Sequence, residues 1–511
     1  MLSTAVITAA LAAAPAYAAV AQSFVPPSSS PTQQSSTYTG KSNSTLPKSP
    51  VVAGKSFDRF IQVVLENTDF ATSASSPVFQ NLSSQGVLMN GYYGVTHVRC
   101  FAARVLRRNA DFVSLLQPSE PNYAALGLGD FFGMHGDAFY AFPKNVSSVA
   151  DLLEAKNISW ASYQENMPYD GFTGFNYTQP NYISGSGNYT YYVRKHSPLI
   201  LTDSVAVNPE RALRHRNFND FAADLNADAL PQWMFITPNL VNDGHDTTID
   251  FQSQWLEYFL YPLLADERFN NNRTLILITY DENEAYEENN NIYTIALGKG
   301  IPKELIGTTD NTYYTHYSSL STVEANWGLG SLGRGDTNKT LANVYSWVAN
   351  ATGYQNNGLT NSSSNLPLTN LTGIFPGFAN DQMWTPILAP NMSAIGAGGG
   401  PVFAGNGTDT SLTSWDQPIN WTARGEPNPG HTDPGYDYSS GSLVIKPSAS
   451  SSSSAAGPSA TGSVGQGGNS QGGNQGGNAQ GSNVQAKSGA VSVVVPFAGA
   501  LAAVAGVVTL L

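Results

Sequence analysis

Cysteine is almost absent from this sequence, because Cys100 is the only one in 511 residues. An intramolecular disulfide bond is therefore excluded. Charged residues are also few, at 12% of the chain, and acidic side chains outnumber basic ones, which gives a formal net charge of −13. This balance argues against a broad basic face and so against nucleic acid as a partner.

The amino-terminal region differs in composition from the middle of the chain. Residues 1–18 form a short apolar run that closes on Ala-Tyr-Ala, the small-residue pattern of a signal peptide. Residues 19–54 follow as a linker rich in Ser, Thr and Pro. Fourteen Asn-x-Ser/Thr sequons between Asn43 and Asn420 favour secretion and a heavily glycosylated surface. In a secreted protein an unpaired cysteine is unusual.

The carboxyl-terminal region is not globular either. Residues 446–490 are rich in Ser, Gly and Asn, a composition that cannot bury a core and therefore predicts a disordered spacer. Residues 491–511 form an apolar tail, and such a tail behind a polar spacer is typical of a GPI-attachment signal. A transmembrane helix is the alternative, since about twenty apolar residues can span a bilayer. No basic segment follows the tail, so we expect a secreted or wall-bound protein that reaches the membrane only through a GPI anchor.

Residues 55–445 have a globular composition and predict one domain. Apolar, strand-like runs occur at residues 60–65, 233–237, 274–280 and 292–297. Helical stretches, each opening with a Ser, Asn or Asp that can cap it, occur at residues 147–156, 218–229 and 250–264. This alternation predicts an α/β fold, a mainly parallel sheet sandwiched by helices, with the Gly, Pro and Asn-rich residues 375–440 on the surface.

Polar side chains follow three of these strand-like runs. Glu66 and Asn67 end the first run, PNLVNDGHDT with His245 follows the second, and Asp281 and Glu282 end the third. Each alone is typical of a solvated turn. Ligands bind outside the carboxyl ends of strands in open α/β sheets, and a hard divalent cation requires oxygen ligands from several such places. Together the three motifs therefore predict a metal site.

Ser119, in the stretch PSEPNYAAL, is the candidate nucleophile. Pro118 and Pro121 flank it and place it near the first turn of a helix. The positive end of the helix dipole favours a phosphate there, and a bound cation would lower the pKa of the hydroxyl group. The alternative is that Ser119 only caps the helix. Three of the seven histidines, His97, His245 and His316, lie in comparable contexts. His196 of RKHSPL is a further candidate.

Six motifs occur in order over residues 55–390: LEN, H…PSEPNY, RKHSPL, NDGHD, TYDENE and THYSSLSTVEANWGLGSLGRGD. Together they resemble the motifs of the secreted fungal acid phosphatases. These enzymes belong to the phosphoesterase family, which also contains bacterial phospholipases C and is related to the alkaline-phosphatase-like superfamily. The resemblance implies an alkaline-phosphatase-like catalytic domain over residues 55–445. It also implies hydrolysis of small phosphate monoesters through a phosphoserine intermediate, for extracellular phosphate scavenging.

The resemblance also implies a role for each matching residue. Ser119 is the nucleophile, and His97 and Asn122 contact phosphate oxygens. Either His245 or His316 protonates the leaving group, a role suited to an imidazole below neutral pH. The divalent metal ion, whose identity the sequence leaves open, takes its ligands from Glu66, Asn67, Ser119, Asp281 and Glu282.

The sequence leaves two alternatives to an acid phosphatase. A phospholipase C or phosphodiesterase of the same family would need an apolar lip beside the site, and the aromatic residues of 163–177 are the candidates for one. An inactive GPI-anchored wall glycoprotein is the other alternative, because the phosphatase motif is interrupted.

The interruption is the segment of residues 98–117, which separates His97 from PSEPNY. Removing it joins the two halves of the motif without a gap. Its twenty residues correspond to sixty nucleotides in frame, and the codons of Val98 and Gln117 permit splice-site sequences. We therefore interpret it as a retained intron; excision would remove Cys100 and change the net charge from −13 to −16. The alternative is a true insertion that forms a basic amphipathic helix.

Overall fold

The computed structural model describes residues 45–97, 100–101, 115–116, 118–181, 186–424, 436–437 and 442–443. The predicted signal peptide, spacer and GPI-attachment signal lie outside the described residues, as do most of the predicted linker and most of the insertion. The predicted globular domain is described over most of its length.

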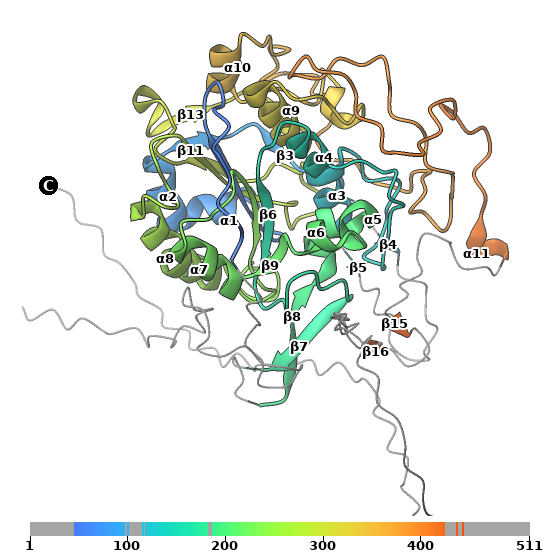
Figure 1. The fold of residues 1–511 in the computed structure, drawn as a ribbon, viewed down its shortest axis with the longest axis horizontal. Helices are drawn as coiled ribbons and strands as arrows, with labels where there is room; N and C mark the ends of the chain where they lie inside the picture. Colours follow the sequence, from blue (N-terminus) through green and yellow to red (C-terminus); the bar gives the residue numbers. More distant parts are fainter. Residues whose placement is uncertain are drawn as a thin grey trace, which may run out of the picture. The chain divides into compact units, whose positions relative to one another are not determined.

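A mixed sheet forms the centre of the fold (Figure 1). Its strands are β1 (Arg59–Leu65), β2 (Val87–Met89), β6 (Trp160–Gln164), β9 (His215–Asn217), β10 (Trp233–Thr237), β11 (Thr274–Tyr280), β12 (Thr294–Leu297) and β13 (Thr308–Asp310). Their order in space is β13-β2-β12-β11-β1-β10-β6-β9. The neighbouring strands from β11 to β9 are parallel, whereas β12 is antiparallel to both of its neighbours. The α/β fold with a mainly parallel sheet is therefore confirmed, and the run at 292–297 forms an antiparallel strand.

The central strands β10, β1 and β11 form the middle of the hydrophobic core. Every residue of these strands is buried except Arg59, which is half-buried. Uninterrupted apolar runs of this kind are expected where helices cover both faces of a parallel sheet. Each large apolar side chain that is fully buried there contributes about 1.5–3 kcal/mol to folding. Phe60, for example, lies opposite Trp233 on one side and Leu275 on the other.

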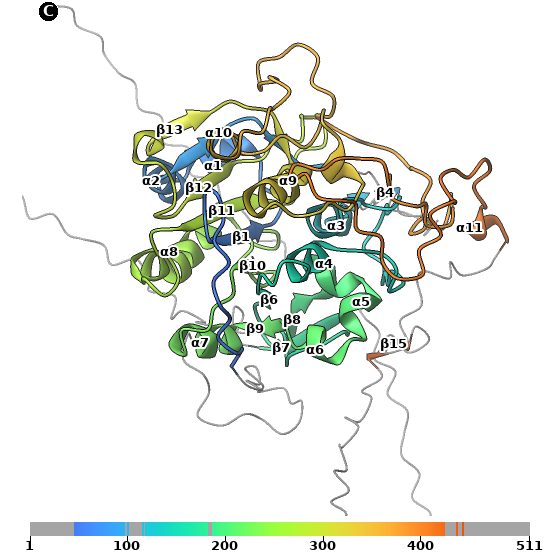
Figure 2. The ribbon, with the colours of Figure 1, turned by 45° about the horizontal axis from the view of Figure 1, so that its top comes forward.

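Helices cover both faces of this sheet. Their bounds are α1 Phe70–Ser75, α2 Pro77–Ser84, α3 Glu120–Leu128, α4 Val149–Glu154, α5 Asp203–Ala206, α6 Pro209–Ala212, α7 Phe218–Asn226, α8 Ile249–Ala265, α9 His316–Trp327, α10 Ser346–Thr352 and α11 Trp421–Arg424. Short 3-10 turns are η1 Arg194–His196, η2 Leu199–Leu201, η3 Lys303–Leu305 and η4 Gly335–Thr337. Figure 2 shows α7 and α8 on one side of the sheet and α3, α4 and α9 on the other. Helices α3 and α9 pack together, and all their residues are buried.

The three predicted helices form as α4, α7 and α8. Ser148 caps α4 in a capping box, and the Asn217 side chain caps α7. Helix α8 begins at Ile249, one residue before the predicted start, because the Thr248 side chain accepts the backbone N–H of Phe251 and so caps it. Helix α7 ends earlier than predicted, before Asp228, which has the left-handed φ of +52°.

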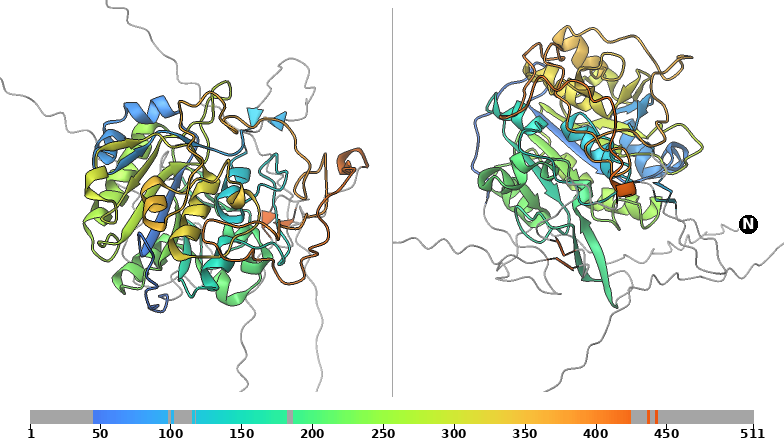
Figure 3. Two further views of the ribbon diagram at one scale, coloured as in Figure 1. Left: turned by 90° about the horizontal axis from the view of Figure 1, so that it is seen from above. Right: turned by 90° about the vertical axis from the view of Figure 1, so that its right-hand side faces the viewer.

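Four two-stranded ladders lie outside the main sheet. They are β3 (Tyr92–Tyr93) with β14 (Tyr314–Thr315), β4 (Cys100–Phe101) with β5 (Leu115–Leu116), β7 (Asn176–Pro180) with β8 (Asn188–Val193), and β15 (Tyr436–Asp437) with β16 (Ser442–Leu443). The β7–β8 hairpin projects from the sheet (Figure 3). The β4–β5 ladder pairs the two ends of the interrupting segment, with Cys100 opposite Leu116.

Two predicted surface segments are partly described. Residues 45–54, within the predicted linker, lie against the domain: the Leu46 N–H donates to Asp224 Oδ1 (2.7 Å) and the Val52 N–H donates to Gln232 Oε1 (2.9 Å). Residues 375–424 contain one short helix, α11, and run past α9 and α3 (Figure 2). In the part of the chain that is described, no helix combines the length and apolar character needed to cross a bilayer.

Candidate active site

The predicted polar motifs meet at one edge of the sheet. Strand β1 lies between β10 and β11, so the residues that follow these three strands are neighbours. The Glu66 N–H donates to the carbonyl oxygen of Asp243 (3.0 Å), and the Asp281 N–H donates to that of Leu65 (3.1 Å). The side chains of Glu66, Asp243, Asp281 and Glu282 are all buried. The topology thus gathers four carboxyl groups in one small volume.

Ser119 joins this group from the amino terminus of α3. Its backbone already has helical angles (φ −71°, ψ −35°), and its side chain makes no capping hydrogen bond. Instead, the hydroxyl group donates to Glu66 Oε2 (2.7 Å), while the Tyr123 hydroxyl donates to Glu66 Oε1 (2.5 Å). The Ser119 side chain therefore does not cap the helix. Its Oγ faces the four buried carboxyl groups of Glu66, Asp243, Asp281 and Glu282 instead.

Lys195, in η1, brings the positive charge nearest to Ser119. Its Nζ lies 3.5 Å from Ser119 Oγ and 2.8 Å from Asp137 Oδ2. Burial lowers the pKa of Lys195, but the carboxylates of Asp137 and Glu66 outweigh that effect and raise the net pKa. The ammonium group is therefore charged at every working pH, and a cation in this position stabilises an alkoxide on Ser119.

His196 follows Lys195 and lies between two carboxyl groups. Its Nε2 is 3.3 Å from Glu66 Oε1, and its Nδ1 is 3.7 Å from Asp243 Oδ2. The ring stacks on Tyr123 with a centroid distance of 4.9 Å. Burial, and then the nearby Lys195 ammonium, hold the pKa of His196 well below its usual value. The imidazole is therefore neutral.

The carboxyl groups fit a cation. Burial raises the pKa of Glu66, Asp243, Asp281 and Glu282. Repulsion by the neighbouring Glu66 carboxylate raises the pKa of the other three further, whereas the charge of Lys195 lowers that of Glu66. Both Asp281 side-chain oxygens and Asp243 Oδ2 are buried without a hydrogen-bond partner among the described residues. No group of three His, Cys, Asp or Glu side chains within the described ranges stands at ligand spacing around one point. The predicted ligand set also draws on Asn67 and Ser119, so by its donor chemistry this site suits a hard divalent ion.

Asn122, in the first turn of α3, links the helix to the loop before His97. Its Oδ1 accepts the N–H groups of Val95 (3.0 Å) and Thr96 (2.9 Å). Its Nδ2 donates to the Thr96 carbonyl oxygen (2.9 Å) and to Glu282 Oε2 (3.3 Å). Both the oxygen and the nitrogen of the Asn122 carboxamide are thus hydrogen-bonded, and they hold the loop before His97 next to Glu282.

The two candidate acids differ in environment. His245 is half-exposed, and its Nδ1 lies 2.7 Å from Asp246 Oδ1. That hydrogen bond raises the pKa of His245, and the Glu66 carboxylate raises it further. His316 is buried at the start of α9, its Nε2 contacts the Asp281 carbonyl oxygen (2.5 Å), and burial lowers its pKa to about 4. His245 is therefore protonated over more of the acidic range.

A sequence model of the Phosphoesterase family matches residues 68–330, which is more than half of the chain. The chain belongs to the phosphoesterase family. The family predicted from the six motifs is therefore confirmed. The matched range contains Ser119, Lys195, Asp243, Asp281 and Glu282, whereas Glu66 and Asn67 directly precede it.

Fungal acid phosphatases are among the relatives of this phosphoesterase. The chain is 48% identical to an acid phosphatase of Aspergillus fumigatus over 313 residues, which cover 61% of this chain and 63% of that one. It is 42% identical to an acid phosphatase of Aspergillus niger over 355 residues, which cover 69% and 75%. A solved protein of the alkaline phosphatase superfamily from Vibrio parahaemolyticus is 11% identical with a TM-score of 0.32, covering 57% and 71%.

Most of the predicted site residues of this phosphoesterase lie in one network. Asn67 Nδ2 donates to Glu282 Oε1 (3.4 Å). The His245 N–H donates to Asp243 Oδ1 (3.0 Å), which joins His245 to the cluster. His97 joins it through the Asn122 loop, and His316 joins it through the Asp281 carbonyl oxygen. Their individual roles in catalysis stay predictions.

Some site residues of this phosphoesterase were not predicted from the sequence. Lys195, Asp243 and Tyr123 contact the cluster as closely as the predicted residues do. Lys195 belongs to the RKHSPL motif and Asp243 to the NDGHD motif, so the sequence carries a signal for both residues. Tyr123 is the last residue of the PSEPNY motif, but nothing in that motif indicates that its hydroxyl contacts Glu66.

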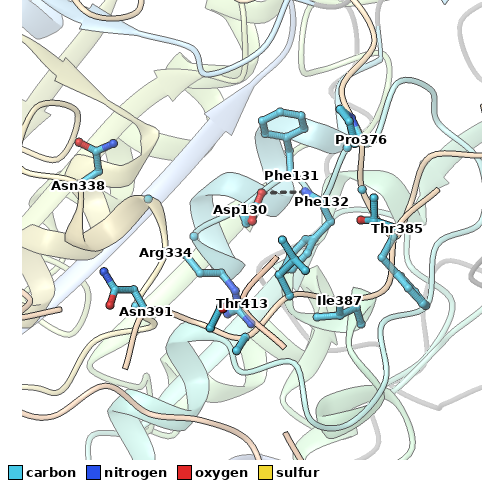
Figure 4. A pocket seen from close by; sticks show the side chains of 18 of the residues that line it. Asp130, Phe131, Phe132, Arg334, Asn338, Pro376, Thr385, Ile387, Asn391 and Thr413 are labelled. Atoms are coloured by element: carbon cyan, nitrogen blue, oxygen red, sulfur yellow. Dashed lines mark hydrogen bonds between the residues drawn. The ribbon is translucent and has the colours of Figure 1, made fainter. Parts of the chain in front are cut away.

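A separate cavity lies at the other end of α3 (Figure 4). Its volume is about 470 Å³, and its lining includes Phe131, Phe132 and Arg334. Asp130, also in the lining, accepts the N–H of Phe132 (2.9 Å). None of the residues around Ser119 lines this cavity, so it is distinct from the candidate active site.

The aromatic residues of 163–177 do not form an apolar lip. Met167, Phe172, Tyr177 and Tyr192 pack together as a small core under the β7–β8 hairpin. Tyr169 is 39% exposed and is the segment's one exposed large hydrophobic side chain among the described residues. The feature expected of a phospholipase C is therefore missing from the described part of this segment.

Proposed function

We propose that this protein is an acid phosphatase that hydrolyses small phosphate monoesters through a phosphoserine intermediate. The observation that carries the proposal is the orientation of Ser119, whose hydroxyl points from the buried start of α3 to Glu66 and Lys195. The two Aspergillus acid phosphatases support the substrate class. The chain spans 63% of the length of the Aspergillus fumigatus enzyme.

In the first step Ser119 Oγ attacks the phosphorus atom of the ester. Glu66 Oε2 already accepts the hydroxyl proton in a hydrogen bond and is placed to hold it, while the Lys195 ammonium stabilises the developing negative charge. The bond between phosphorus and the ester oxygen breaks. His245 donates its proton to the departing alkoxide, which leaves as an alcohol.

In the second step water attacks the phosphoserine and releases inorganic phosphate. His245, now neutral, accepts the proton of the water, and the Ser119 oxygen recovers its proton from Glu66. A divalent cation bound by Glu66, Asn67, Asp281 and Glu282 would neutralise phosphate charge and lower the pKa of the Ser119 hydroxyl. The two orphaned oxygens of Asp281 support this assignment.

Ser119→Ala tests the proposal. With p-nitrophenyl phosphate as substrate, we expect the wild type to show activity that rises toward acidic pH, and the variant to lose kcat by about a thousandfold or more. Ser411→Ala, at an exposed serine remote in sequence from the site motifs, is the matched control. Equal activity of the wild type and Ser119→Ala at every pH, with divalent metal supplied, would reject the proposal.

We also propose that the enzyme works outside the cell, on the wall or surface, and scavenges phosphate there. Several sequon asparagines have exposed side chains, as a glycosylated surface requires: Asn81, Asn157, Asn188, Asn272, Asn338, Asn350, Asn391, Asn406 and Asn420. Intact cells are expected to hydrolyse an impermeant phosphate ester, and a phosphatidylinositol-specific phospholipase is expected to release that activity. Activity confined to lysed cells would contradict this location.

A further inference from the structure

A loop from beyond the matched family range contacts the candidate site. The Leu371 carbonyl oxygen accepts the N–H of His97 (2.8 Å), and the Thr369 carbonyl oxygen accepts the N–H of Asn290 (2.6 Å). Asn290 in turn donates its side-chain amide to the Thr96 carbonyl oxygen (2.9 Å). Residues 369–371 therefore bind directly to the loop that ends at His97.

Asn370 lies in the middle of this loop, and its side chain is engaged at both ends. Its Nδ2 donates to the carbonyl oxygens of Glu288 (2.8 Å) and Tyr286 (3.2 Å). Its Oδ1 lies 3.2 Å from His97 Nδ1. Only an NH₂ group can satisfy two carbonyl acceptors, so these contacts fix the orientation of the carboxamide. The oxygen must face His97.

This orientation determines the proton position on His97. Because Asn370 Oδ1 can only accept, the ring nitrogen Nδ1 must carry the hydrogen. The ring also stacks on Tyr286, with a centroid distance of 4.6 Å and an interplanar angle of 19°. Asn370 thus sets the proton on Nδ1 and Tyr286 sets the ring plane. With Nδ1–H fixed in this way, a second proton on Nε2, which only the imidazolium form carries, would let the ring donate to a phosphate oxygen.

We propose that Asn370 is a positioning residue for His97 and that it carries no glycan in the active protein. Asn370, Leu371 and Thr372 form a sequon, yet both hydrogens of the Asn370 amide are bonded to carbonyl oxygens. A glycan would replace one of these hydrogens and push the loop away from His97. The inference rests on the proposed phosphatase function, in which His97 contacts the phosphate group.

The kinetic test uses Asn370→Ala and Thr372→Ala in a host that does not N-glycosylate. We expect Asn370→Ala to weaken both kcat/KM and the binding of inorganic phosphate by about tenfold to a hundredfold. Thr372→Ala is the matched control, because it destroys the sequon, leaves the Asn370 amide unchanged and alters an exposed side chain. Thermal unfolding of each variant establishes that the fold is retained.

A double-mutant cycle with His97→Ala separates positioning from a merely structural role. If Asn370 acts through His97, adding Asn370→Ala to His97→Ala changes phosphate binding less than twofold. If the losses multiply, the inference is overturned. The inference is also overturned if Asn370→Ala leaves phosphate binding unchanged.

The modification is tested in a glycosylating yeast. Asn350 has an exposed side chain in a sequon and serves as the reference site for glycan occupancy by peptide mass spectrometry. We expect active protein to be unmodified at Asn370, and the finding of a glycan there in the active fraction overturns the inference. If the wild type binds phosphate but hydrolyses no ester, the proposed function fails, while the binding cycle still decides the role of Asn370.

Discussion

At the scale of single residues, the site depends on side chains that do not take their usual role. Ser119 stands at an N-cap position but points its hydroxyl away from the helix amides, toward Glu66. The sequence could predict its position from the flanking prolines. It could not decide between cap and nucleophile, because that depends on where β1 places Glu66, and β1 is far away in the chain.

Asn122 illustrates the same limit. Its resemblance to a family motif predicts contact with phosphate oxygens, whereas its carboxamide forms four hydrogen bonds within the protein. Such a network depends on distances of a few ångströms between three segments. No pattern of spacing along one chain carries that information.

Glu165, directly after β6, leads to a prediction about pH. Asn242 Nδ2 and the Asn239 N–H donate to its carboxylate and thereby brace the loop that carries Asp243. Burial nevertheless raises the pKa of Glu165 to about 7. The folded state therefore binds this proton more tightly than the unfolded state, and the stability that it contributes is lost as pH rises through about 7.

We expect the melting temperature of the wild type to fall more steeply between about pH 4.5 and pH 7 than that of Glu165→Gln, which has no proton to release. Thermal unfolding of both proteins across this range gives the two slopes. Parallel curves would mean that Glu165 does not titrate differently in the folded and unfolded states.

At the scale of elements, the strands were predicted better than their arrangement. The runs at 233–237 and 274–280 match β10 and β11, since long uninterrupted apolar runs have few alternatives in a covered sheet. The direction of β12 was not predictable, because it depends on tertiary pairing rather than on composition. The three polar strand ends are nevertheless correctly grouped, because β1, β10 and β11 are parallel and their carboxyl ends therefore lie at the same edge of the sheet.

Helix α3 provides a prediction at this scale. A Cβ added at Gly127 would lie 2.6 Å from Pro198 Cβ, and the proline ring cannot move aside. Alanine gains about 1 kcal/mol in helix propensity over glycine, but overpacking costs about 1–3 kcal/mol, so the clash prevails. Relief by a shift of α3 would move Ser119 away from Lys195.

We therefore expect Gly127→Ala to lower both the melting temperature and kcat/KM, as measured by thermal unfolding and by hydrolysis of p-nitrophenyl phosphate. Gly136→Ala is the matched control, because its added Cβ would meet only the Tyr140 hydroxyl at 4.0 Å. Unchanged kcat/KM in a destabilised Gly127→Ala protein would show that the clash at residue 127 does not displace Ser119.

At the scale of the whole molecule, residues 98–117 remain the main open prediction. Most of them lie outside the described residues, but their described ends pair as β4 and β5, with Phe101 opposite Leu115. The two described ends of the segment therefore lie side by side. Its removal can join His97 to Pro118 without rearranging the strands on either side.

We expect the chain without residues 98–117 to have the higher kcat/KM, because a direct link between the His97 loop and α3 holds the phosphate contacts and the nucleophile in register. The measurement compares both forms of the chain with p-nitrophenyl phosphate and amplifies the transcript across the segment. Transcripts that contain only the long form would contradict the intron interpretation, and a less active short form would contradict the kinetic expectation.

The central place of β1 has a consequence for how the protein is made. Its two partners in the sheet, β10 and β11, lie about 170 to 215 residues further along the chain. At a synthesis rate of about 5–20 residues per second, β1 waits roughly 10 to 40 s before it can pair. During that time the apolar residues of β1 have no partner strand to cover them, so we expect the nascent chain to depend on a chaperone from the moment that Glu66 and Asn67, the first of the predicted metal ligands, emerge.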